Sequence, residues 1–188
     1  QMAMFLMVPL ALVERVGMPV STHWKIYLPV VLASFVIMVP AIIWSERKAR
    51  NKTLLLSAIL ALIASQLLFL VSGDTLATIA GGLFVFFTAF NLLEASLPSL
   101  VSRVAPPSAK GAALGAFNTA QAVGAALGSA VGGAIALRFG AHGVFVFCTV
   151  LAVVWWLWAR SMRAPPVVAL REYVVGEHVD LDRLRAQL

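Results

Sequence analysis

Long apolar runs separated by short polar gaps follow one another from residue 2 to residue 163. The first run, residues 2–13, is shorter than the about 20 residues that a helix needs to cross a bilayer, so we expect part of a span there. The five other expected spans are residues 24–44, 53–71, 76–101, 111–137 and 143–159. The pattern predicts an all-α polytopic membrane bundle over residues 1–163.

The pattern changes at both ends of the chain. The sequence opens inside an apolar run with Gln1 rather than Met and ends inside an amphipathic helix, so we expect a fragment of a longer protein. After Pro165 and Pro166, residues 167–175 have the composition of a short strand, and residues 178–188 place apolar side chains on one helical face. Residues 164–188 are predicted to begin a small cytosolic α+β domain. A disordered tail is the alternative.

Composition and charge placement agree with a membrane protein. Hydrophobic residues make up 61% and charged residues 12%, whereas about a quarter of residues are charged in soluble domains. The net charge of +6 does not indicate nucleic acid, because the basic residues fill short gaps between spans, where they lie beside anionic lipid. The gaps that we assign to the cytoplasm hold Arg47, Lys48, Arg50, Lys52, Arg103, Lys110, Arg160 and Arg163; the opposite gaps hold only Arg15, Lys25 and Arg138. This bias places the C-terminus in the cytoplasm.

Glu94 is an isolated acid in an apolar span, nine residues before Arg103, or roughly 13 Å of helix. A charge at the bilayer centre costs on the order of 3 kcal/mol, so the carboxylate needs a cavity, a partner or a proton. One interpretation is a proton-sensitive group on a transport path. The other is a latch that accepts backbone or amide hydrogen bonds. Asn91, three residues earlier, lies on the same helical face.

Amide side chains also occur in the other spans. Asn118 and Gln121 share a face of the span at 111–137 and are candidates for contact with substrate or for hydrogen bonds between helices. Ser65 and Gln66 form a weaker polar pair, for which packing is the favoured interpretation. No nucleophile–base pair, metal-ligand cluster or phosphate loop is recognisable, so we expect no enzyme, metal or cofactor.

Glycines recur at four-residue spacing in the span at 111–137. Such spacing allows the backbones of two membrane helices to approach closely. The expected helix-packing positions are Gly111, Gly115, Gly124, Gly128, Gly132 and Gly133. The spacing predicts a tight interface, either static or sliding.

These residues resemble the C-terminal half of a major facilitator superfamily transporter of the drug:proton antiporter branch, in its YajR-type group. The resemblance covers nearly all of residues 2–163 and is carried by HWKIYLPVVLASFVIMVPAIIWSERK and by FVFFTAFNLLEASLPSLVSRVAPPSAKGAALGAFNTAQAVGAALGSAVGG. It implies the end of the seventh through the twelfth span of a twelve-span fold. The tail resembles the start of the small ferredoxin-like domain that this group appends.

Two family motifs are partly matched. ERKARNK stands where the family has its cytoplasmic-loop signature, acid–Arg–x–Gly–basic, and implies gate-loop roles for Glu46, Arg47 and Arg50, with Ala49 in place of the glycine. GAALGSAVGG is similar to the antiporter glycine motif GxxxGPxxGG, with Ser129 in place of the proline.

The resemblance implies proton-coupled efflux of small organic or drug-like compounds by alternating access, driven by a proton gradient, in a bacterial inner membrane. Substrate would bind near the midplane, between this half and the missing N-terminal six-helix half of the same chain. The positions expected to face that path are Glu94, Asn91, Asn118 and Gln121. The alternatives are an uptake permease of the same fold and a non-transporting sensor or scaffold that acts through its cytosolic domain.

Overall fold

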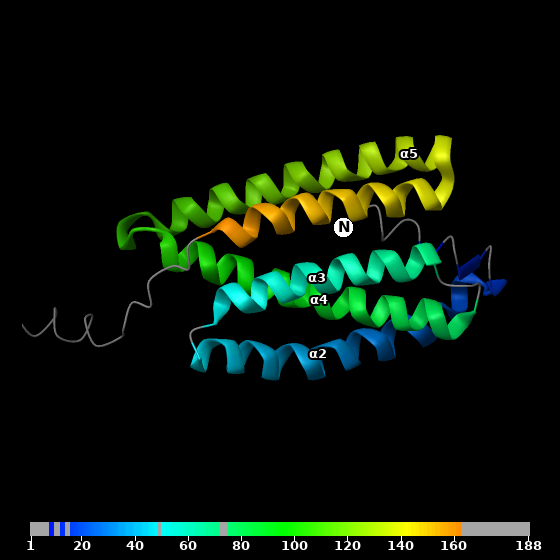
Figure 1. The fold of residues 1–188 in the computed structure, drawn as a ribbon, viewed down its shortest axis with the longest axis horizontal. Coiled ribbons are helices and arrows are strands. Elements are labelled where there is room, and N and C mark those ends of the chain that lie inside the picture. Colours follow the sequence, from blue (N-terminus) through cyan, green and yellow to red (C-terminus); the bar gives the residue numbers. More distant parts are fainter. Residues whose placement is uncertain (1–7, 10–11, 14–15, 49, 72–74, 163–188) are drawn as a thin grey trace, which may run out of the picture.

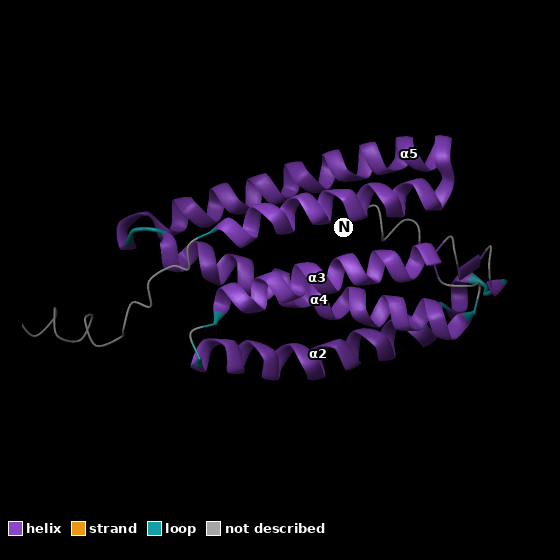
Figure 2. Cartoon of the chain, viewed as in Figure 1, coloured by secondary structure: helices purple, strands orange, loops and turns teal. Residues whose placement is uncertain are grey.

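The structure is a computed structural model that describes residues 8–9, 12–13, 16–48, 50–71 and 75–162. These residues form helices and short turns and no strand (Figure 2). The long helices are α2 (Trp24–Arg47), α3 (Asn51–Val71), α4 (Leu76–Val104) and α5 (Lys110–Ser161), and the short 3-10 turns are η1 (Val20–Thr22) and η2 (Pro107–Ala109). The expected β–α start of a tail domain at residues 164–188 and most of the first expected span lie outside the described residues.

All four long helices are apolar and long enough to cross a membrane. This identifies the chain as an integral membrane protein. α2 continues through Pro29 and Pro40, and α4 continues through Pro98. Thr75 begins α4 by accepting a hydrogen bond from the backbone N–H of Thr78, which satisfies one of the free donors at a helix start.

α5 contains two membrane-length arms rather than one straight helix. Gly140 interrupts it with φ 63° and ψ −165°, a backbone conformation that is essentially restricted to glycine. The two arms run back along each other from this residue, at the right of Figure 1. The expected turn between the spans at 111–137 and 143–159 therefore falls at Gly140.

The packed core lies among α2, α3 and α4, and α3 also carries most of the contact with α5. Phe69 of α3 stacks on Phe145 of the second arm, with ring centroids 5.3 Å apart. Gly82 of α4 leaves room for the Phe69 ring, since a Cβ there would lie 2.9 Å from a ring carbon. The most completely buried apolar side chains include Val8, Leu12, Ile59, Leu83, Phe86, Leu93, Val144 and Phe145.

The first arm of α5, residues 110–139, is the least covered part of the bundle. Val123 and Leu127 are 54% and 61% exposed. A Cβ added at Gly111, Gly115, Gly124, Gly128 or Gly133 would meet nothing within 4 Å. At these five positions the described helices do not make the close approach that the glycine spacing predicts, whereas the sixth, Gly132, is buried.

The basic gaps that the sequence assigns to one side of the membrane meet at one end of the bundle. The ends of α2, α4 and α5 and the start of α3 lie together at the left of Figure 1. The contacts that join them include the hydrogen bond that Lys52 Nζ donates to the backbone oxygen of Arg160 at 2.8 Å and the ion pair of Arg103 with Glu46. This end is called the charged end below.

We predict that Gly140→Ala destabilises the protein by about 1–3 kcal/mol, because an L side chain disfavours this φ and ψ. A Cβ there would meet no neighbouring atom, so the cost would come from the backbone. Unfolding of the detergent-solubilised protein measures it. Gly81→Ala is the control, because Gly81 is helical and equally open, and should be neutral or stabilising. Equal stability of both variants would contradict the prediction.

Candidate functional site

Glu94 and Gln121 lie together, although they are on different helices. Gln121 Nε2 on the first arm of α5 donates to Glu94 Oε1 at 2.8 Å and lies 3.0 Å from Oε2. Both carboxylate oxygens of Glu94, on α4, therefore face the same nitrogen, Nε2 of Gln121. Among the described residues, no basic side chain forms an ion pair with Glu94.

This contact has the geometry of a latch, because the Glu94 carboxylate accepts hydrogen bonds from an amide on another helix. The contact joins α4 to the first arm of α5.

Glu94 and Gln121 also line a cavity of about 450 Å³. Its walls come from α3, α4 and both arms of α5. The described lining is mainly apolar: Leu62, Leu93, Leu97, Phe117, Ala120, Gly124, Ala125, Gly128, Cys148, Leu151, Ala152 and Trp155 surround the polar residues Gln66, Glu94 and Gln121. Volumes of roughly 300–1,000 Å³ with a few polar groups are typical of sites for small organic ligands.

Asn91 does not share this cavity with Glu94. Its Nδ2 donates to Ser34 Oγ on α2 at 2.8 Å, and the fully buried Ser34 donates to the backbone oxygen of Val31 at 2.7 Å. The two residues, three positions apart on α4, therefore contact different neighbouring helices. Asn91 joins α2 to α4, which is the geometry of an interhelical hydrogen bond.

Asn118 is exposed on the first arm of α5 and is not part of the described cavity wall. Its neighbour Thr119 donates to the backbone oxygen of Gly115 within the same helix at 2.9 Å. Of the four residues expected on a substrate path, the structure thus brings Glu94 and Gln121 together and leaves Asn91 and Asn118 apart from them.

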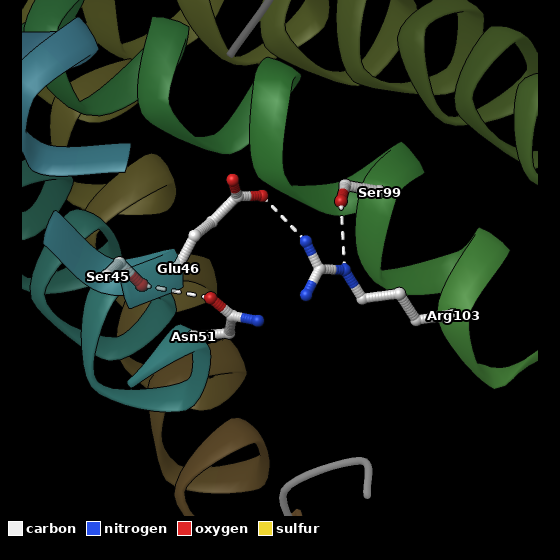
Figure 3. A network of polar contacts seen from close by, with 5 residues as sticks. All are labelled: Ser45, Glu46, Asn51, Ser99 and Arg103. Carbon is white, nitrogen blue, oxygen red and sulfur yellow. Dashed lines mark hydrogen bonds and ion pairs between the residues drawn. The ribbon is translucent and has the colours of Figure 1, made fainter. Parts of the chain in front are cut away.

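A second polar cluster lies at the charged end (Figure 3). Arg103 Nη2 of α4 pairs with Glu46 Oε1 of α2 at 2.6 Å, and Arg103 Nε donates to Ser99 Oγ at 3.3 Å. Ser45 donates to Asn51 Oδ1 at 3.0 Å across the link between α2 and α3. Both members of the ion pair are about half exposed, so solvent screens it and it contributes little to stability.

The other expected gate-loop residues contact different groups. Arg50 lies over the Trp44 ring, 5.6 Å from its centroid, and Lys48 lies over the same ring. Arg47 is exposed at the last residue of α2. Of Glu46, Arg47 and Arg50, only Glu46 is joined to a distant helix in the described structure.

Three further polar residues lie at these sites and were not singled out as site residues from the sequence. Ser34 and Arg103 are the partners of Asn91 and Glu46, and a serine or arginine alone does not reveal which helix it faces. Gln66 is 3% exposed, and its Oε1 has no hydrogen-bond partner among the described residues. Ser65 beside it is satisfied within α3 by Leu62, as the packing interpretation predicts.

Comparison with known proteins matches the chain to one protein family and to several transporters. The sequence profile of the Major Facilitator Superfamily matches residues 1–178. The chain is 36% identical over 168 residues to the inner membrane transport protein YajR of Escherichia coli (strain K12), covering 89% of this chain and 37% of YajR.

Two Buchnera aphidicola proteins, each named only as an uncharacterized transporter, are also similar. One, from subsp. Acyrthosiphon pisum, is 30% identical over 59% of this chain and 28% of its own length. The other, from subsp. Baizongia pistaciae, is 28% identical over 70% of this chain and 34% of its own length. The chain thus spans about a third of the length of the curated relatives it matches.

We predict a coupling energy of about 0.6 kcal/mol between Ser34 and Asn91, the typical size for a hydrogen bond between membrane helices. A double-mutant cycle of Ser34→Ala and Asn91→Ala, read by unfolding in detergent, measures it. The control cycle pairs Ser34→Ala with Thr149→Ala, since the Thr149 hydroxyl donates within its own helix. The same coupling energy in both cycles would show that it does not arise from the hydrogen bond between α2 and α4.

Proposed function

Since the chain belongs to the major facilitator superfamily, we propose that it forms half of a proton-coupled exporter of small organic compounds. The family match and the relatives show that the chain is a transporter polypeptide of this family and that it is similar to YajR. Export, proton coupling and the class of cargo are our proposal.

The observation that supports it best is the position of Glu94. This carboxylate lies in the wall of a largely apolar cavity and has an amide rather than a base as its partner. An ionisable side chain in a membrane span costs insertion energy, so it marks a candidate functional site. A group whose hydrogen-bond pattern changes with protonation, and which joins two helices, can couple proton binding to a rearrangement of the bundle.

The open first arm of α5 supports a second six-helix half as partner. A Cβ added at any of five of its glycines would meet nothing within 4 Å in the described chain, and Val123, Leu127 and Val131 are exposed on it. A surface of small residues suits packing against another helix in the membrane. We infer that the second half covers this face, that cargo passes between the halves, and that Asn118 lies on that side.

We further infer a bacterial inner membrane and a charged end that faces the cytoplasm, from the bias of lysine and arginine between the spans. The gate-loop residues Glu46, Arg47 and Arg50 would then lie at the cytoplasmic gate. An uptake permease is the second candidate; the partial match of residues 124–133 to the antiporter glycine motif favours export.

We expect Glu94→Gln to abolish most proton-driven efflux, with a loss of roughly 10-fold or more, while the protein still inserts in the membrane. The glutamine, like a protonated glutamate, keeps one oxygen that can accept from Gln121, but it can neither bind nor release a proton. Efflux from cells or inverted vesicles with an imposed pH gradient measures the effect. Thr88→Val is the control on the same helix, since Thr88 donates only to Phe84 of α4. Unchanged efflux between about pH 6 and 8 would refute the proton role.

For the gate, we expect Glu46→Arg and Arg103→Glu each to slow transport by up to about fivefold. This factor corresponds to the free energy of an exposed ion pair, at most about 1 kcal/mol. The double variant should recover the rate, because it restores a pair with the charges exchanged. Transport by the three variants at equal membrane abundance tests this. Loss without recovery in the double variant would mean that the two residues act independently.

A further inference from the structure

Two cations from distant parts of the sequence meet on the outside of the bundle, at its charged end. Lys52, at the start of α3, donates from Nζ to the backbone oxygen of Arg160, near the end of α5, at 2.8 Å. The Arg160 guanidinium lies over the Trp156 ring, 5.8 Å from its centroid. An ammonium carries three N–H donors and a guanidinium five, so the described contacts leave donors on both side chains for a further acceptor. The two helix ends lie together at the left of Figure 1.

No carboxylate of the described residues neutralises this pair of cations. The two described carboxylates, Glu46 and Glu94, are each bonded to residues other than Lys52 and Arg160. Two positive charges held close together repel each other, and an anion placed between them turns that repulsion into attraction. A phosphate group suits the position, because its oxygens accept charge-assisted hydrogen bonds from both ammonium and guanidinium groups.

An apolar stripe on the second arm of α5 leads to the same place. Its members are Val146, Val150, Val153 and Leu157, which are between 37% and 55% exposed. Their spacings of four, three and four residues place them on one helical face, and Arg160 follows on that face three residues after Leu157. The stripe covers about 16 Å of helix, close to the roughly 15 Å depth of hydrocarbon in one leaflet of a bilayer.

The composition of this surface suits lipid better than another helix. Residues 144–159 contain no glycine, whereas close packing between membrane helices favours small residues, which the first arm of α5 supplies. Trp158, near the charged end of the same arm, is 79% exposed, and exposed tryptophan is typical of the headgroup level of a bilayer. The two cations therefore lie at the depth of lipid phosphates, with the apolar stripe at the depth of the acyl chains.

We propose that Lys52 and Arg160 bind the phosphate of an anionic phospholipid, one acyl chain of which lies along the apolar stripe. The lipid would bridge the start of α3 and the end of α5, beside the hydrogen bond that already joins them. This is a defined site formed by two helices, which goes beyond the general attraction of basic loops to a membrane. It depends neither on the direction of transport nor on proton coupling.

Native mass spectrometry of the detergent-solubilised full-length gene product tests the site, because it resolves the protein with one bound lipid. The probes are dioleoyl phosphatidylglycerol, dioleoyl phosphatidylcholine, and glycerol 3-phosphate, which has the phosphate without acyl chains. The wild type should bind phosphatidylglycerol about tenfold more tightly than phosphatidylcholine, whose ammonium offsets the phosphate charge. An excess of glycerol 3-phosphate should not displace the lipid, because the stripe contributes to its binding.

Arg160→Gln and Lys52→Gln should each weaken phosphatidylglycerol binding about fivefold, the effect of one basic residue near an anionic lipid. Arg160→Gln keeps the hydrogen bond from Lys52, because the acceptor is a backbone oxygen, so the contact between α3 and α5 is not removed with the charge. Arg160→Lys keeps the charge and should retain most of the affinity.

The matched control is the double variant Lys48→Gln with Lys110→Gln, compared with Lys52→Gln with Arg160→Gln. Both remove two positive charges from the charged end, but only the second pair removes the proposed phosphate ligands. The control should keep the preference for phosphatidylglycerol. An equal loss in the two double variants would overturn the proposal, since overall charge rather than a site would then attract the lipid.

Three other results would also overturn it. Equal affinity of the wild type for the two lipids would mean that the phosphate charge is not recognised. Displacement of the lipid by glycerol 3-phosphate would mean that the cations bind a free phosphate and that the stripe is not used. Unchanged phosphatidylglycerol affinity in Lys52→Gln with Arg160→Gln would leave some other group as the partner of these cations.

Discussion

A polar side chain inside a membrane bundle must find its partner on another helix or in a cavity, because lipid supplies neither donors nor acceptors. The hydrogen bond from Gln121 to Glu94 satisfies this requirement at the junction of α4 with the first arm of α5. Most residues of that arm are exposed, and α5 as a whole contacts α3 more extensively than α4. The hydrogen bond from Gln121 to Glu94 therefore helps to hold a largely exposed helix against α4.

The bundle has two regions of different character. In one, α2, α3 and α4 are joined by buried apolar side chains and by the hydrogen bond between Asn91 and Ser34. In the other, the arms of α5 meet the bundle through the stacked rings of Phe69 and Phe145 and around an open cavity. Apolar burial does not by itself drive helices together in lipid, so close packing and hydrogen bonds between helices hold both regions.

Much of the architecture was predictable because apolar length and turn residues are local properties. The five later expected spans lie within helices of the structure, and the turn in residues 138–142 lies at Gly140, where only glycine suits the backbone. Periodicity also indicated that Glu94 and Gln121 belong to polar faces. It could not show which faces meet, since the partner of a residue depends on helix rotation and tilt.

Asn91 and Glu94 show this limit most clearly. Three residues apart, they share a helical face in sequence, yet one contacts α2 and the other α5. Gln66 shows a second limit, because a lone amide in an apolar span has the same pattern whether it is satisfied by packing or left facing a cavity. Only the absence of a described donor near Oε1 separates the two cases.

The cavity and the contact between α4 and α5 share two residues, because Glu94 and Gln121 line the cavity and also hydrogen-bond to each other. A group bound in the cavity would therefore lie beside the contact that joins the first arm of α5 to α4. In the exporter that we propose, cargo and proton would both act on this contact, and no long relay through the bundle would be needed.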